Sequence, residues 1–246
     1  MRAFFITLIV IVVLTAGIIS QLPMSLATDR LRPYAEFGEV RGTIWNGEID
    51  DIEVNGEVVG DAAIALHFLP LLSREAVADL SFSGRGLDGA GTAGFDGTLI
   101  TLEDAVGRAD LARFGMVDAM GQTLRGTVDA SVRKIEFSLE EGCKTADLSA
   151  ETDTISRSLG VYAGRGFMMS GDGYCDGEDL VVPLSGEGED AALNAELRIN
   201  QRGQYRSRLA VTPKNDDLGR FLQSMGFTRD GDVYVVERGG RLEDNL

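Results

Sequence analysis

Residues 4–22 contain no charged side chain, whereas charged residues recur along the whole chain from Asp29 onward. A helix over this stretch rises about 28 Å, close to the roughly 30 Å hydrocarbon core of a bilayer. Inside lipid every backbone amide must be paired within the segment, so the stretch predicts a transmembrane helix. We therefore expect a membrane anchor over residues 1–27, with a short tip in the cytoplasm, and an exported domain over residues 28–246.

A cleaved signal peptide is the alternative interpretation of this beginning. Arg2 supplies a basic start, and Ser25-Leu26-Ala27 offers small residues at the spacing that a signal peptidase needs. The apolar stretch is longer than the usual signal core of about 7–15 residues, which favours an uncleaved anchor. Charge bias does not decide the orientation, because Arg2 on one side faces Arg30 and Arg32 on the other.

Beyond residue 40 the pattern changes to short apolar stretches separated by glycine. The chain contains 31 glycines and 5 prolines, and this punctuation is typical of short strands joined by tight turns. Residues 62–68 alternate, which places Ile64, Leu66 and Phe68 on one face of a strand and His67 on the solvent side. The pattern therefore predicts a mainly β domain built on an antiparallel sheet.

Two connections follow from the same pattern. We expect a turn over residues 69–74, with a returning strand over residues 76–83. Residues 102–120 fit neither the strand period nor the helix period throughout. They predict a strand followed by an irregular or short helical connection.

An internal echo suggests that the sheet is built from two similar halves. Residues 40–44 recur as residues 124–128, and residues 52–54 recur as residues 135–137. Repeated patterns of this kind indicate repeated structural units. We expect one unit over about residues 40–121 and the other over about residues 122–212.

The end of the chain predicts a helix and a strand over residues 213–238. Asn215 suits the N-cap position, Asp216 and Asp217 suit the first turn, and Gly226 suits the end of the helix. The final strand is expected over residues 232–237, with a frayed tail over 239–246. The helical period makes one apolar stripe from Leu218, Phe221, Leu222 and Met225.

The charge of the chain excludes one class of partner. With 23 basic and 39 acidic residues the formal net charge is −16, which repels the phosphate backbone of nucleic acids. Lysine occurs only at positions 134, 144 and 214, so there is no polybasic patch for anionic lipids either. We expect no nucleic acid among the partners.

The cysteines bear on the compartment. Cys143 and Cys175 would form one disulfide in an oxidising compartment, and two free buried thiols are the alternative. A disulfide favours the periplasmic side of a bacterial inner membrane. The only histidine is His67, so we expect no metal centre.

No pattern in the chain indicates an enzyme. Residues 84–89 and 89–94 both satisfy GxGxxG, but a turn and a strand follow them instead of the helix that dinucleotide binding needs. We therefore interpret the glycines of both segments as turn residues. The acidic stretch 172–179 lacks the order of a calcium loop and is interpreted as a solvated hairpin loop. There is no GxSxG elbow, and Trp45 is better explained as a half-buried core residue than as a sugar platform. We expect no catalytic, cofactor-binding or metal-binding residues.

Several segments resemble the type II secretion system protein N family (GspN). The resemblance lies in Leu22-Pro23-Met24-Ser25 after the apolar stretch, in the paired cysteines, and in residues 194–205 and 222–234. Its main motif covers residues 40–47 and includes Gly42, Thr43, Ile44, Trp45 and Gly47.

The resemblance implies a non-enzymatic accessory component of the machine that exports folded proteins. Such a component is a single-pass protein of the bacterial inner membrane, has its bulk in the periplasm, and has other type II secretion components as partners. The family's sheet is also similar to the curled AsmA-like β sheets associated with lipid traffic. The second hypothesis is therefore a membrane-tethered protein that binds or transfers lipid through contacts with acyl chains.

Overall fold

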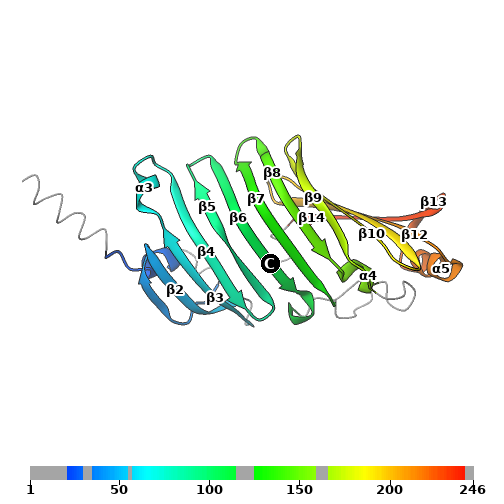
Figure 1. Ribbon diagram of the computed structural model, residues 1–246, viewed down its shortest axis with the longest axis horizontal. Coiled ribbons are helices and arrows are strands. Elements are labelled where there is room, and N and C mark those ends of the chain that lie inside the picture. The colour runs from blue at the N-terminus through cyan, green and yellow to red at the C-terminus, as the bar shows by residue number, and fades with distance from the viewer. Residues whose placement is uncertain (1–20, 30–34, 55–56, 115–124, 159–165, 242–246) are drawn as a thin grey trace, which may run out of the picture. The chain divides into compact units, whose positions relative to one another are not determined.

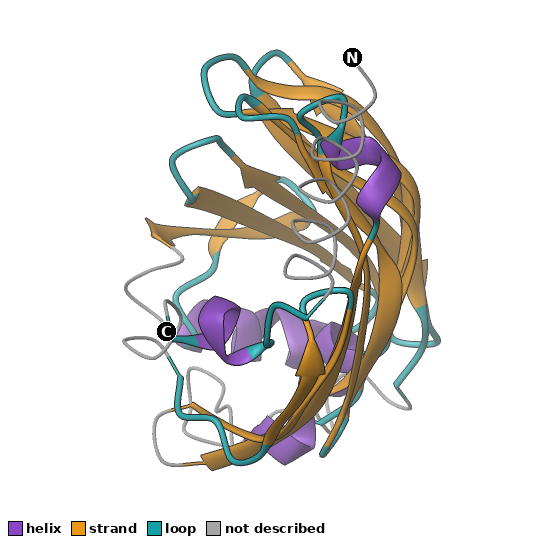
Figure 2. Ribbon diagram, turned by 90° about the vertical axis from the view of Figure 1, so that its left-hand side faces the viewer, coloured by secondary structure: helices purple, strands orange, loops and turns teal. Residues whose placement is uncertain are grey.

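The computed structural model describes residues 21–29, 35–54, 57–114, 125–158 and 166–241. The chain divides into two compact units, residues 1–85 and residues 86–246, here called the first unit and the second unit. Most of the described residues lie in strands and the helices are short, which confirms a mainly β fold (Figure 2). Neighbouring strands within each unit pair antiparallel, which confirms the predicted sheet type.

The first unit has a small sheet in the order β1-β2-β3-β4. Each strand pairs with the one that follows it in the chain, so every connection is a hairpin. Two short helices flank these strands, one before β1 and one between β3 and β4. The elements are α2 (Ser25–Thr28), β1 (Val40–Thr43), β2 (Asn46–Val54), β3 (Glu57–Leu66), α3 (Phe68–Leu71) and β4 (Ala76–Gly84).

The second unit has a larger sheet in the order β5 to β12, then β14, then β13. The direction of the strands turns progressively from β6 to β12, as expected of a twisted sheet (Figure 1). Its strands are β5 (Leu87–Phe95), β6 (Leu99–Asp110), β7 (Thr127–Ser138), β8 (Gly142–Thr152), β9 (Met169–Asp176), β10 (Asp179–Glu187), β11 (Ala191–Ile199), β12 (Gln204–Pro213), β13 (Thr228–Asp230) and β14 (Val233–Arg241). Its helices are η1 (Leu111–Phe114), α4 (Thr154–Ser158) and α5 (Asp216–Ser224).

The two faces of the second sheet differ in chemistry. Residues directly opposite each other on paired strands share a face. One such row runs Val106, Ser131 and Ser149 across β6, β7 and β8, and another runs Arg108, Asp129 and Glu151. The rows between these lie on the opposite face. One is formed by Gly107, Ala130 and Ala150, and the other by Ala105, Val132 and Leu148. The sheet therefore has one face rich in polar groups and one face of small and apolar side chains.

The core of the second unit lies where α5 packs on β11, β12 and β14. Leu218 and Leu222 of the helix are fully buried against Leu193, Val211 and Tyr234 of the strands. Phe221 and Met225 complete the predicted stripe and pack against the same cluster. The predicted amphipathic helix is therefore confirmed.

The helix ends follow the sequence signals. The Leu218 backbone N–H donates to Asn215 Oδ1 at 2.8 Å, and Asp216 and Asp217 occupy the first turn. Gly226 has φ +85°, a left-handed conformation that favours glycine after a helix. Capping and termination are thus set by the residues expected from the sequence.

Three local predictions were wrong. Phe68 does not continue the strand of Ile64 and Leu66, because β3 ends at Leu66 and Phe68 begins α3. Pro70 falls in the first turn of that helix, where its missing N–H costs no helical hydrogen bond. The glycines of residues 89–94 lie inside β5 and do not form a turn. The third wrong prediction concerns the tail of the chain, residues 239–246.

The predicted fraying of residues 239–246 does not hold for the described part of the tail. Gly239, Gly240 and Arg241 extend β14 and pair with β12. The ring of Tyr205 covers Gly240 so closely that a Cβ on that glycine would be 3.0 Å from the Tyr205 hydroxyl oxygen. The aromatic ring fills the space above a residue without a side chain, which explains pairing where sequence alone indicates weak structure. Residues 242–246 lie outside the described residues.

Two larger predictions stay predictions. Nearly all of the apolar stretch 4–22 lies outside the described residues. Among the described helices, none is both long and apolar enough to cross a bilayer. The division into repeats at 40–121 and 122–212 also stays a prediction. The connection after β6 is confirmed as far as it is described, because η1 follows the strand.

Candidate interaction sites

The motif of residues 40–47 forms the hairpin between β1 and β2. Thr43 pairs with Asn46, so Ile44 and Trp45 make a two-residue turn. Gly42 has φ +82°, which other residues adopt only with strain. A Cβ on Gly47 would lie 2.7 Å from Met24 Cγ and 2.9 Å from the Thr43 carbonyl oxygen. Both glycines of the motif therefore have a structural reason.

The segment that follows the apolar stretch is bonded to this hairpin. The Ile44 N–H donates to the Leu22 carbonyl oxygen at 3.1 Å, and the Met24 N–H donates to the Gly42 carbonyl oxygen at 3.2 Å. Pro23 forms a bridge with Thr43. Met24 is 3% exposed and fills the space above Gly47. The hairpin thus fixes the point at which the apolar stretch joins the first unit.

Sequence reasoning missed this role of Met24. Its only signal was the short segment 22–25 that follows the apolar stretch. Trp45, at the turn, is half-buried and meets the Phe68 ring edge-on, with 5.7 Å between ring centroids and 64° between ring planes. The motif residues therefore gather with Met24 and Phe68 in one part of the first unit.

The two cysteines are joined by a disulfide. Cys143, near the start of β8, is bonded to Cys175, near the end of β9, and their Cα atoms are 5.5 Å apart. Cys143 is buried. The disulfide excludes the alternative of two free thiols, and it closes a loop between residues that are 32 positions apart.

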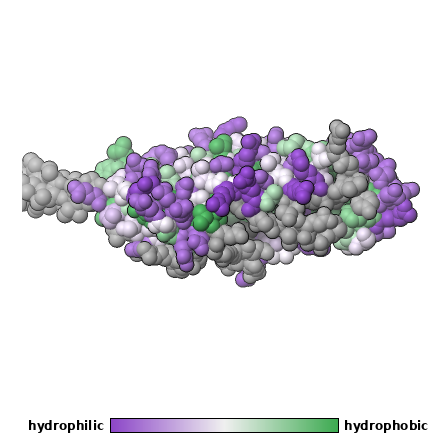
Figure 3. All heavy atoms as spheres, turned by 90° about the horizontal axis from the view of Figure 1, so that it is seen from below, coloured by the Kyte–Doolittle hydropathy of each residue, from purple (hydrophilic) through white to green (hydrophobic). Residues whose placement is uncertain are grey.

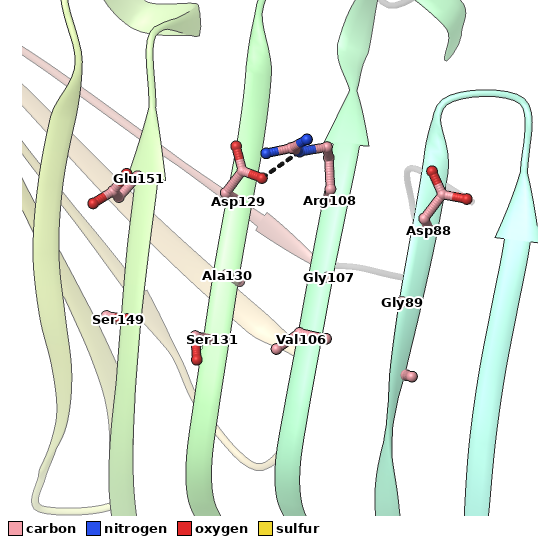
Figure 4. A pocket seen from close by; sticks show the side chains of 11 residues that line it. Asp88, Gly89, Val106, Gly107, Arg108, Asp129, Ala130, Ser131, Ser149 and Glu151 are labelled. Atoms are coloured by element: carbon pink, nitrogen blue, oxygen red, sulfur yellow. Dashed lines mark hydrogen bonds and ion pairs between the residues drawn. The ribbon is translucent and has the colours of Figure 1, made fainter.

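A shallow groove of about 600 Å³ lies across β5 to β8 on the polar face of the second sheet (Figure 4). Arg108 Nε donates to Asp129 Oδ1 at 2.5 Å near one end. Asp88 and Glu151 add two more carboxylates to the lining, and Val106 contributes an apolar side chain that is 59% exposed. The lining contains no histidine, cysteine or lysine. Its carboxylates and its guanidinium suit a polar contact.

Ion pairs cover much of the polar surface. Lys134 Nζ lies 3.1 Å from Glu103 Oε1 and 2.9 Å from Glu136 Oε1, and Thr145 donates to Glu136 Oε2 at 2.8 Å. Lys134, and after it Thr145, lowers the pKa of Glu136, while hydrogen bonds to Glu136 and Glu103 raise the pKa of Lys134. These groups are typical of a solvated face. In the view of Figure 3 hydrophilic side chains predominate and hydrophobic ones are scattered.

The remaining residues singled out from the sequence are placed as follows. His67 is 42% exposed and lies 2.8 Å from Asp79, so its predicted solvent exposure is confirmed. The acidic stretch 172–179 was interpreted as a hairpin loop, but residues 172–176 belong to β9 and Asp179 begins β10, so only residues 177 and 178 form the turn. Asp176 pairs with Arg198. Within the described ranges, no three His, Cys, Asp or Glu side chains are grouped so as to hold a metal ion.

The comparisons with known proteins give one match. The family model of the type II secretion system (T2SS), protein N, matches residues 34–237. This range includes the hairpin motif, both cysteines and α5. No curated protein and no solved structure matches the chain.

Proposed function

The chain belongs to the type II secretion system protein N family, and we propose that it is a non-enzymatic accessory component anchored in the inner membrane. The observation that carries this proposal is the family match, which covers both units of the chain. In the proposal the stretch of residues 4–22 spans the bilayer, and residues 28–246 lie in the periplasm. The chain acts there by contact with other components of the secretion machine.

The compartment is supported by the disulfide. Disulfides persist in oxidising compartments such as the periplasm and are rare in the cytosol. The bond between Cys143 and Cys175 lies in the second unit, so that unit is the part expected outside the inner membrane. The anchor is supported by the absence of charge in residues 4–22 and by the hydrogen bonds that join Leu22 and Met24 to the motif hairpin.

The contact role is supported by the surface. The groove on β5 to β8 is open and lined by mixed polar and apolar groups, which suits a protein contact better than a small-molecule site. A surface that is acidic overall favours a partner with basic groups.

A secretion assay tests the proposed function. The gene is deleted and the chain is supplied at a limiting level, and secreted hydrolases are measured in the medium. We expect secretion to fall without the chain and to return with the wild type. Val106→Glu is expected to restore secretion less well than Ser185→Ala, a control in β10 outside the groove. Normal secretion in the deletion strain when no chain is supplied would count against the role.

Membrane placement is tested separately. We expect the full chain to stay with the membrane after carbonate extraction. Protease added to spheroplasts should degrade residues 28–246, whereas protease added to intact cells should leave them whole. A chain that is released by carbonate, or protected in spheroplasts, would contradict the proposed topology.

Lipid binding is the second candidate, and one observation favours it. Phe95 and Ile100 are paired across β5 and β6, continue the apolar face of the second sheet, and are 42% and 43% exposed. Exposed apolar groups of this kind can contact acyl chains. Lipid that copurifies with the full chain is measured by mass spectrometry for the wild type and for Phe95→Ser/Ile100→Ser. We expect the wild type to carry more lipid than the variant. Equal lipid content in the two proteins would remove this candidate.

A further inference from the structure

The connection between β3 and β4 exposes a cluster of large apolar side chains. Phe68 is 52% exposed, Leu69 is 74% exposed and Leu72 is 73% exposed, and we call these three residues the apolar tip. No charged residue occurs in positions 68–73. Single exposed apolar residues are common on soluble proteins, but three large ones within five consecutive residues mark a contact surface.

The apolar tip lies close to the end of the uncharged stretch. The Ile44 N–H donates to the Leu22 carbonyl oxygen at 3.1 Å, and the Leu66 N–H donates to the Ile44 carbonyl oxygen at 3.3 Å. Leu22, Ile44 and Leu66 are therefore on three adjacent backbone segments, with roughly 4.8 Å between neighbours. Phe68 follows Leu66 by two residues. The place where the uncharged stretch ends and the tip thus belong to one small region of the first unit.

Trp45 connects these two features. It lies in the turn that is hydrogen-bonded to Leu22, and its ring meets the ring of Phe68 edge-on. Tryptophan is enriched at the membrane–water interface, because its ring is apolar while its N–H can remain hydrated. The chain therefore has its tryptophan next to an exposed apolar turn, at the end of its uncharged stretch.

We propose that the apolar tip inserts into the interfacial layer of the bilayer that holds residues 4–22, with Trp45 at the level of the headgroups. This inference rests on the proposed anchoring of the chain. With a net charge of −16 the chain is not drawn to anionic headgroups, so insertion is driven by apolar burial. A second attachment point beside the anchor would hold the first unit at a set orientation to the membrane.

Fluorescence of Trp45 tests the proposal, because it is the only tryptophan in the chain. The full chain is reconstituted into zwitterionic phosphatidylcholine liposomes, with and without lipid brominated near the headgroup end of the acyl chains. We expect brominated lipid to reduce the Trp45 emission at least twofold. In Leu69→Glu/Leu72→Glu at least half of this quenching should be lost, because glutamate removes the tip from the apolar layer.

The matched control places the same change on two exposed apolar residues of the second unit outside the groove, Leu139→Glu/Met168→Glu, which are 51% and 48% exposed in the wild type. Quenching in this control should equal that of the wild type. Far-UV circular dichroism of both variants should match the wild type, which excludes unfolding as the cause of any loss.

Three outcomes would overturn the proposal. They are a chain that floats with the liposomes without quenching of Trp45, equal quenching in Leu69→Glu/Leu72→Glu and the wild type, and loss of quenching in the control variant. The first of these is the result expected if a protein partner covers the tip. The liposome result does not depend on the secretion assay, so the failure of the proposed function and the failure of this inference are distinguishable.

Discussion

Removal of the disulfide should lower the thermal stability of the second unit by a calculable amount. The bond closes a loop between residues 32 positions apart, and Cys143→Ala/Cys175→Ala opens it. For a loop of this length the chain-entropy relation gives about 3.7 kcal/mol of stabilisation at 25 °C. In a body of this size each kcal/mol shifts the melting temperature by roughly 2–4 °C. The double variant should therefore melt roughly 7–15 °C lower than the wild type.

Alanine is the better replacement at both positions. Cys143 is 4% exposed, so a serine hydroxyl there would add the cost of a buried polar group to the effect of opening the loop. Alanine leaves a small cavity and no polar atom. The difference in melting temperature then reports mainly on the constraint that the bond places on the unfolded chain.

Far-UV circular dichroism during heating at pH 7 measures this difference on the full chain in detergent. The wild type treated with a reductant should melt close to the double variant, and the double variant should not respond to the reductant. Equal melting temperatures for the oxidised wild type and the double variant would refute the reasoning. They would mean that the loop is already restricted in the unfolded chain.

Three further predictions follow from the same contacts. Asn215→Ala should cost about 1 kcal/mol, because the Leu218 N–H loses its capping oxygen, and urea unfolding should show the difference; an unchanged midpoint would contradict it. Leu222→Ala should cost more, about 2–5 kcal/mol, because the side chain is fully buried, so a smaller loss than for Asn215→Ala would argue against the packing of α5. Lys134 lowers the pKa of Glu136 below 4.5, so this carboxylate contributes stability above pH 4.5 that is lost as the pH falls further. Lys134→Met should therefore reduce the difference between urea midpoints at pH 7 and pH 3.5, and an unaltered difference would contradict this.

Local patterns predicted the parts of the fold that local chemistry controls. The N-cap, first turn and apolar stripe of α5 were identified correctly, since each of these signals acts within a few residues. The strands around Ile64 and Leu66 were also identified, because alternation places their apolar side chains on one face. The prediction that Phe68 continues the strand was wrong for the same reason. The alternation extends to Phe68, but this residue begins α3.

The candidate sites were predicted less completely. The hairpin motif was found from its residues, and the disulfide was found as one of two alternatives. The contact of Met24 with Gly47 was not found, because the two residues are far apart in the chain and neither carries a signal for the other. The groove across β5 to β8 was also missed, because it combines side chains from four strands.

By itself the sequence determined that this chain is mainly β, that it is acidic overall, and that residues 4–22 carry no charge. Composition and periodicity are properties of the chain alone. Only the tertiary structure decided which distant segments meet. It paired Gly239–Arg241 with β12 beneath the Tyr205 ring, seated Met24 over Gly47, and brought the apolar tip near Leu22. Such contacts depend on strand register and on the space left by a missing side chain. Those quantities exist only after the chain has folded.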